Sequence, residues 1–286
     1  MLELGFDPTI PEAAFYGSLA LFALIERILP RRKDRYSFMV RWGSNFFLLT
    51  LELLIAWVLV PGGLIVLAAY AQTQGWGLLN SLSLESGLLP VIATVLLWDL
   101  VKYWEHRLLH RIPWFWRAHV VHHADLDVDF TTTLRHHPFE VLLSLVVGAI
   151  AVVTLGLSPL GIFVFSILAP VVATMSHANI RWNKTVDKWL RLLIMTRDAH
   201  AVHHSALRKE TDSNYSVVFI WWDYLFGTYR AAPEQGLDRF DVGVEYFRTP
   251  QDLTVARVLT MPFRIPKDLP SSSPATATED GSESAT

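Results

Sequence analysis

The sequence predicts an all-α, polytopic membrane protein with four to five transmembrane helices and a cytoplasmic helical cap. Three observations lead to this fold class. First, 52% of the 286 residues are hydrophobic and only 18% are charged, and the mean hydropathy is +0.32. A soluble domain carries about 25% charged residues, so this chain lacks the polar residues that a water-facing surface needs. Second, the apolar residues gather in long runs. Third, the basic residues avoid every second connection between these runs.

Five apolar runs approach the roughly 20 residues that an α-helix needs to cross a bilayer. In chain order they are residues 13–29, 44–60, 87–103, 141–156 and 159–175. The second run continues past Pro61 toward Ala71, and only Leu157 and Ser158 separate the fourth run from the fifth. We therefore expect the last two runs to form a helical hairpin that barely reaches the far side, which leaves four to five spans.

The distribution of basic residues predicts the orientation of these spans. None of the 24 Lys and Arg residues precedes Arg27, and none lies in residues 61–86 or at the 157–158 turn. Cytoplasmic loops of membrane proteins carry an excess of Lys and Arg. Five alternating crossings place the N-terminus outside and every basic residue, with the C-terminus, in the cytoplasm. The chain is thus predicted to be a multi-pass protein of the cell membrane.

Composition excludes several classes of site. The chain contains no Cys, which removes disulfides, thiolate catalysis, Cys-ligated zinc and iron–sulfur clusters. A net charge of −3 provides no basic field, so no nucleic-acid partner is expected. The residues from about 271 onward are rich in Ser, Thr, Ala and acidic side chains, and they are predicted to form a disordered tail.

The histidines form three clusters at helical spacing. All eleven lie between His106 and His204. The spacing is i, i+4 in the first cluster and i, i+3, i+4 in the other two, which places each cluster on one helix face. The clusters are His106 and His110; His119, His122 and His123; and His200, His203 and His204, with His136, His137 and His177 between them.

This pattern predicts metal binding. Neutral imidazole is a good ligand for iron, zinc, copper and nickel, and several imidazoles on one helical stripe converge on a point. The eight clustered histidines exceed the three or four that one ion accepts, and His137 and His177 bring the donors to about ten. His136 fits less well, because its neighbour His137 is the one that precedes Pro138. We therefore predict a histidine-rich site for two ions at the cytoplasmic face of the membrane.

The motifs narrow the chemistry of this site. The sequence around His106 reads Glu-His-Arg-Leu-Leu-His, which lacks the His-Glu-x-x-His motif of zinc proteases, and paired Glu-x-x-His motifs are also missing. After these exclusions, the preferred interpretation is a dinuclear iron site that activates O₂, because iron supplies the one-electron chemistry that zinc cannot. A zinc-dependent membrane hydrolase and a non-enzymatic metal-binding or transport protein stay open as alternatives.

The segments 106–110, 119–123 and 200–204 resemble the three histidine boxes of the fatty acid hydroxylase/sterol desaturase superfamily. The resemblance extends through residues 133–138, 177–179 and 210–215 to 222–229, and it covers about residues 99–230, nearly half of the chain. These motifs identify the superfamily specifically, but they discriminate poorly among its individual members. The chain looks like the bacterial sterol desaturase branch, without the cytochrome b5 domain of some relatives.

This resemblance implies a membrane-bound, non-haem di-iron hydroxylase or desaturase that oxidises a membrane lipid at an unactivated C–H bond, with O₂ as co-substrate. The electrons are expected from an external ferredoxin or reductase, because the chain has neither Cys nor a dinucleotide fingerprint. With the spans, the resemblance predicts a transmembrane region (1–86), a catalytic domain (87–230) and a C-terminal cytoplasmic segment (231–286). Carried onto this chain, the ligands are His106, His110, His119, His122, His123, His137, His177, His200, His203 and His204.

Carboxylates near the clusters are candidates for a supporting role. Asp99 lies seven residues before His106 on the same helix face, and we expect its carboxylate to orient a metal-bound imidazole. Asp127 and Asp129 are expected to be solvated. For Glu52, which lies in the second span, a buried partner and a role in a substrate channel are both open. The weaker candidates for orienting a ligand are Asp125, Asp198, Asp212 and Asn214.

Overall fold

The computed structural model describes residues 5–7, 9–84 and 87–266, and within these ranges the regular structure is helical, with two isolated β-bridges. The predicted disordered tail lies outside the described residues. The helices are α1 (Thr9–Ile28), α2 (Phe38–Leu59), α3 (Gly63–Thr73), α4 (Leu78–Ser81), α5 (Leu88–Arg111), α6 (Pro113–His123), η1 (Phe130–Leu134), α7 (Pro138–Leu155), α8 (Pro159–His177), α9 (Lys184–Leu190), α10 (Arg197–His203), α11 (Arg208–Thr211), α12 (Trp221–Leu225), η2 (Pro250–Leu253) and α13 (Val255–Arg264).

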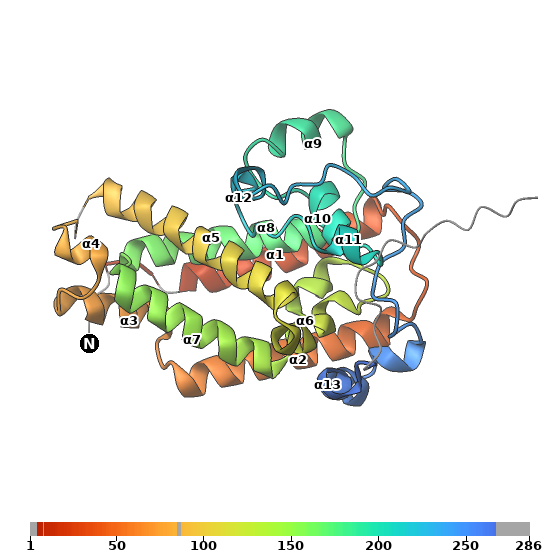
Figure 1. Ribbon diagram of the computed structural model, residues 1–286, viewed down its shortest axis with the longest axis horizontal. Helices are drawn as coiled ribbons and strands as arrows, with labels where there is room; N and C mark the ends of the chain where they lie inside the picture. Colours follow the sequence, from red (N-terminus) through yellow and green to blue (C-terminus); the bar gives the residue numbers. More distant parts are fainter. Residues whose placement is uncertain (1–4, 8, 85–86, 267–286) are drawn as a thin grey trace, which may run out of the picture.

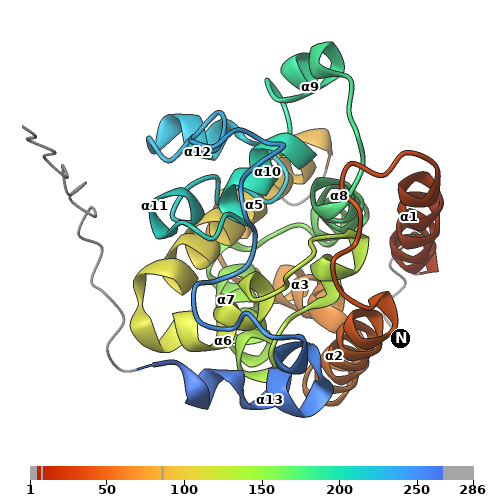
Figure 2. The same cartoon turned by 90° about the vertical axis from the view of Figure 1, so that its right-hand side faces the viewer.

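Five long helices, α1, α2, α5, α7 and α8, run along the long axis of the molecule and form a bundle (Figure 1). α8 lies between α1 and α5 and contacts both (Figure 2). Buried side chains of α1, α5 and α8, such as Phe22, Trp98 and Phe165, share one apolar core. The bundle therefore provides a continuous apolar interior that leads toward the cap.

The two ends of the bundle differ in construction. α3 and α4 lie at one end, and the short helices α10 and α11 lie at the other (Figure 1). The α7–α8 turn also lies at the first end, because a side chain added at Gly156 would meet the carbonyl oxygen of Trp76 at 2.7 Å. Gly156 adopts a φ of 65° and Ser158 caps α8, so a short turn joins the two helices that hold the fourth and fifth apolar runs. That this pair barely reaches the far side stays a prediction. The segment with α3 and α4 and the α7–α8 turn, which were both predicted on the outer side of the membrane, thus lie at the same end of the bundle.

Among the described residues, three helical segments are long and apolar enough to cross a membrane: Phe38–Ser81, Pro138–Leu155 and Pro159–His177. They contain the second, fourth and fifth predicted spans. The first and third predicted spans form α1 and α5, of 20 and 24 residues, but they are not among these three segments. The chain is a membrane protein with helical spans, and a total of four to five crossings stays a prediction.

The outer faces of the bundle carry large apolar side chains. Trp57 of α2 and Ile150 of α7 are 73% and 58% exposed. Such exposure is unfavourable in water, whereas lipid tails solvate it at no cost. The surface of the bundle therefore agrees with the hydrophobic composition of the sequence.

A buried arginine connects the bundle to the cap. Arg41, near the start of α2, donates from Nε to Asp125 Oδ1 at 2.7 Å and from Nη1 to Asp129 Oδ2 at 2.9 Å. The prediction that Asp127 and Asp129 are solvated is wrong: Asp129 is 4% exposed, and only 11% of the Asp127 side chain is exposed, where it pairs with Arg35. A buried guanidinium needs several acceptors, and these loop residues supply them. The pairing holds the loop that follows α6 in place.

Candidate metal centre

Nine of the eleven histidines converge in two groups, and within each group one nitrogen atom from every ring lies within 4.8 Å of the corresponding atoms of the others. All nine side chains are buried or nearly so. The five-histidine group consists of His106, His110, His119, His123 and His203, and the four-histidine group consists of His122, His177, His200 and His204.

Helix periodicity divides two of the sequence clusters between the groups. In α6, His119 and His123 belong to the five-histidine group, whereas His122 belongs to the four-histidine group. At α10 the division is reversed, since only His203 joins the five-histidine group. Neighbouring positions on a helix point about 100° apart, so α6 and α10 can each contribute to two sites. His177, the last residue of α8, completes the smaller group.

The ring nitrogens lie at distances that fit bound metal ions. His119 Nε2 is 3.1 Å from His106 Nε2 and 3.2 Å from His123 Nε2. A neutral ring nitrogen holds either one hydrogen or one lone pair, so it cannot form good hydrogen bonds to both neighbours. Two imidazole nitrogens that bind one ion at about 2.1 Å, in adjacent positions at right angles, lie about 3 Å apart. The donor set therefore fits an ion better than it fits hydrogen bonds among the rings.

The four-histidine group has the same geometry. His200 Nε2 is 3.0 Å from His177 Nε2 and 3.2 Å from His204 Nε2, and His177 Nε2 is also 3.1 Å from His122 Nε2. Again a single nitrogen faces two others. Each group thus offers a converging set of Nε2 atoms to one ion.

Two backbone carbonyls orient imidazole rings of the five-histidine group. His106 Nδ1 lies 2.7 Å from the carbonyl oxygen of Tyr215, and His203 Nδ1 lies 2.7 Å from that of Ser213. A carbonyl only accepts, so each Nδ1 carries the hydrogen and each Nε2 keeps its lone pair for a metal. Sequence reasoning missed these contacts, because a backbone carbonyl leaves no signal in a sequence.

Two carboxylates orient further imidazole rings of this group. His119 Nδ1 is 2.9 Å from Glu140 Oε1, and His110 Nδ1 is 3.3 Å from Asp212 Oδ1. Asp212 was a weaker candidate in the sequence, whereas Glu140 was not a candidate at all. The signal for Glu140 was its place two residues after Pro138, directly before the fourth predicted span, and the structure places it in the first turn of α7. Four of the five rings in this group therefore have a partner on the outer nitrogen.

The four-histidine group is oriented differently. His177 Nδ1 lies 2.7 Å from the carbonyl oxygen of Ala173, but Nδ1 of His122, His200 and His204 is buried without a hydrogen-bond partner among the described residues. Burial, together with neighbouring imidazoles, lowers the pKa of these three rings well below the ordinary 6.5. They are therefore neutral at physiological pH, which is the form that binds metals.

Two of the predicted or possible ligands lie outside both groups. His137 caps the start of α7: its Nδ1 accepts from the backbone N–H of Phe139, and its Nε2 is 3.2 Å from the carbonyl oxygen of Leu259 in α13. The structure therefore does not bring His137 to the other predicted ligands. His136 Nδ1 lies 3.2 Å from Glu52 Oε2, so Glu52 has a partner in the cavity described below.

Asp99 forms no hydrogen bond or ion pair with a histidine among the described residues. Its carboxylate accepts from the backbone N–H groups of Val218 and Phe219 at 3.0 and 2.9 Å, and from Trp222 Nε1 at 2.9 Å. It therefore holds the segment that follows Tyr215 rather than a ligand ring. The other candidates also bond elsewhere: Asp125 to Arg41 and Thr132, Asp198 to Arg31 and Arg197, and Asn214 to the backbone of Ala199 and Arg230.

A cavity of about 480 Å³ leads from the bundle to both histidine groups. Side chains of the long helices, such as Phe15, Leu49 and Trp98, give it a mainly apolar wall. Five of the grouped histidines also line it: His106, His119, His122, His177 and His200. An apolar cavity of this size in a membrane bundle suits a lipid chain or ring.

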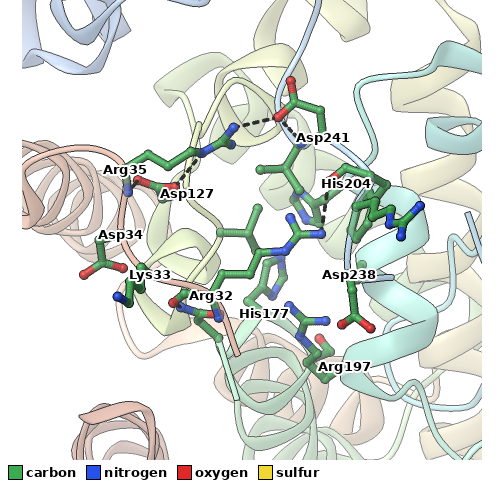
Figure 3. Close-up of a pocket in the computed structure, with 17 residues that line it drawn as sticks. Arg32, Lys33, Asp34, Arg35, Asp127, His177, Arg197, His204, Asp238 and Asp241 are labelled. Carbon is green, nitrogen blue, oxygen red and sulfur yellow. Dashed lines mark hydrogen bonds and ion pairs between the residues drawn. The ribbon is translucent and has the colours of Figure 1, made fainter. Parts of the chain in front are cut away.

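A second, polar pocket of about 350 Å³ approaches the four-histidine group from the cap side. Figure 3 shows His177 and His204 at this pocket, with Arg32, Arg197 and Asp238 around them. The residues come from the α1–α2 loop, from the loop after α6, from the end of α8, from α10 and its C-cap, and from the segment around residue 240. The four-histidine group is therefore bordered both by the apolar cavity and by the polar pocket, whereas the five-histidine group borders only the apolar cavity of these two.

Residues 91–228 match the model of the fatty acid hydroxylase family. This part of the chain carries all eleven histidines, so the resemblance drawn from the histidine boxes is confirmed. No solved structure matches the chain.

Curated relatives include several named lipid oxygenases. The chain is 28% identical to human alkylglycerol monooxygenase over 48% of this chain and 30% of that protein. It is 26% identical to ornithine lipid hydroxylase OlsE of Rhizobium tropici over 80% of this chain and 69% of that protein. It is 27% identical to methylsterol monooxygenase 2-2 of Arabidopsis thaliana over 57% of this chain and 62% of that protein. The relatives are thus oxidoreductases, as predicted, and the chain spans less than a third of the human protein.

Proposed function

We propose that this chain is an O₂-dependent di-iron oxidoreductase that hydroxylates or desaturates a membrane lipid at an unactivated C–H bond. The observation that carries the proposal is the convergence of nine imidazoles in two groups, five of which line an apolar cavity. The names of the relatives, which act on alkylglycerol, ornithine lipid and methylsterol, support a lipid as substrate.

The proposed ligands are the nine grouped histidines, without His137. Iron, when bound, supplies the one-electron chemistry with O₂ that an unactivated C–H bond requires. The protein's part is to hold the imidazoles neutral and converging, and Glu140 and Asp212 orient two of them from behind. The apolar cavity excludes water and positions the carbon to be oxidised near the two groups.

The proposed topology places the histidines and the C-terminus on the cytoplasmic side, with four to five crossings. It rests on the excess of Lys and Arg at that end of the spans. We also propose residues 1–86 as a transmembrane region, 87–230 as the catalytic domain and 231–286 as a cytoplasmic segment. An external ferredoxin or reductase then supplies the electrons, and it approaches from the cap side.

The test begins with the protein purified from membranes without added metal. Metal analysis should find iron, at about two ions per chain, and O₂ consumption should depend on lipid and on reductant. Comparing the lipids of cells with and without the active protein should show a species that has gained one oxygen atom or lost two hydrogens.

Other outcomes would favour other functions. Product formation without O₂ and with bound zinc would identify a hydrolase that uses metal-activated water. Bound metal with no change in any lipid, with O₂ and electrons supplied, would favour a metal-binding or transport role.

A further inference from the structure

The apolar cavity contains one polar pair that the metal site does not use. Glu52 lies in α2, within the apolar segment Phe38–Ser81, and its Oε2 is 3.2 Å from Nδ1 of His136. About a third of each side chain is exposed, and both line the cavity. An ionisable residue in a membrane segment is unfavourable unless it faces a polar interior, so its presence here points to a function.

The pair lies next to the metal centre. The ring of His136 stacks on that of His122, with centroids 5.6 Å apart and planes 13° from parallel. No partner is described for Nε2 of His136 or for Oε1 of Glu52, and both residues face the same cavity as the histidine groups. A substrate in the cavity therefore meets unused hydrogen-bonding capacity beside the four-histidine group.

Another polar cluster on the cavity wall behaves differently. Lys102 Nζ donates to Glu105 Oε2 at 2.9 Å and to Ser144 Oγ at 3.3 Å, and Ser144 donates to the second oxygen of Glu105. Both oxygens of Glu105 have partners, and the residue is 7% exposed. The polar groups of this cluster form hydrogen bonds with one another, whereas the Glu52–His136 pair leaves atoms available for a ligand.

The geometry points to Glu52 and His136 as the residues that select the substrate: they bind a hydroxyl or amide N–H of the lipid, next to the carbon that is oxidised. The inference rests on the proposed function and names its substrate class. A carboxylate accepts a hydrogen bond from such a group, and a charged acceptor in an apolar cavity makes this bond strong. A lipid with a hydrogen-bond donor near the reacting carbon is therefore preferred over a plain hydrocarbon chain of the same shape.

The experiment compares ligands that differ by one hydroxyl. The metal-loaded protein is placed in nanodiscs under argon without reductant, so that no turnover is needed. Its thermal stability is measured with hexadecan-1-ol against hexadecane, and with 5α-cholestan-3β-ol against 5α-cholestane. We expect at least one alcohol to stabilise at a mole fraction about 10-fold or more lower than its hydrocarbon, as one hydrogen bond to a charged group implies.

Variants assign this preference to the pair. Glu52→Leu and His136→Phe should reduce the alcohol-to-hydrocarbon ratio to near one, and Glu52→Gln should give an intermediate ratio. Leu is favourable within a membrane segment, so Glu52→Leu should retain the fold. The matched control is Thr50→Val, because Thr50 is on the same helix, does not line the cavity and bonds only to its own helix.

The inference is overturned if the native protein has no preference for either alcohol, or if Glu52→Leu and His136→Phe keep the preference, or if Thr50→Val loses it equally. Its failure is separate from that of the proposed function. Lipid oxidation without an alcohol preference would remove only this inference, whereas a preference without any oxidation would keep the binding site and remove the reaction.

Discussion

The five-histidine and four-histidine groups lie side by side but are built differently. In the larger group, Nδ1 of four rings has a carbonyl or carboxylate partner, including Glu140. In the smaller group, only His177 has such a partner among the described residues. The smaller group also borders both the apolar cavity and the polar pocket, through His177.

This difference has a physical consequence. A partner on the outer nitrogen fixes the tautomer and direction of a ligand ring before the metal arrives. The five-histidine group is therefore preorganised, whereas rings of the smaller group are positioned largely by the ion itself. We expect the larger group to hold its ion more tightly, and the smaller group to hold the ion that is exchanged or lost first.

The largest effect is expected from removing a ligand. Replacing His119 or His200 by Ala should reduce turnover below detection, because each substitution removes a donor that faces two neighbouring rings. Metal analysis should show about one ion per chain in place of two. His137→Gln is the matched control, since His137 lies outside both groups. Loss of metal in this control would return His137 to the set of ligands.

Metal removal should separate the two groups. Titration with a chelator is expected to release metal in two steps, with affinities that differ by about 10-fold or more, the effect of one outer partner. Repeating the titration with His204→Gln should remove the first, weaker step. Release in a single step, or loss of the stronger step in this variant, would contradict the difference in preorganisation.

Changing the outer partners should sharpen the comparison. Glu140→Gln is expected to weaken the stronger site by about 10- to 100-fold, because His119 then loses a charged acceptor at 2.9 Å. Asp212→Asn should have a smaller effect, since its oxygen is 3.3 Å from His110 and the carboxylate also pairs with Arg208. Metal affinity measured by competition with a chromophoric chelator tests both. An equal effect of the two variants would show that distance and charge do not matter here.

The smallest effect is expected on the stability of the metal-free protein. Burial lowers the pKa of His204 in the folded state, whereas the unfolded ring has its ordinary pKa of 6.5. Below pH 6.5 the unfolded state binds more protons, so the free energy of unfolding is largest above this pH and falls as the solution becomes more acidic. Removing this group in His204→Gln should reduce the slope by up to about 1.4 kcal/mol per pH unit. Denaturation in detergent from pH 7.5 to about 5.5 measures the slope, and an unchanged slope would contradict the assignment.

Much of the molecule follows from local sequence patterns. The apolar runs predict the long helices, and the i, i+3, i+4 spacing predicts histidines on helices that converge, because both patterns depend on helix geometry alone. The histidine boxes also predict the family. The same local reasoning failed for Asp129, which is buried because it pairs with the buried Arg41. It also failed for Asp99, whose carboxylate binds a backbone segment instead of an imidazole ring.

What the sequence by itself determined is therefore the helical membrane class and the presence of a histidine site. Only the tertiary structure decided how nine rings divide into five and four, that Glu140 orients His119, and that Glu52 finds His136 inside the cavity. The physical reason is the distance along the chain over which each interaction acts. Hydropathy and helical period act over neighbouring residues, whereas the site depends on the packing of α5, α6, α8 and α10, whose relative positions no local pattern records.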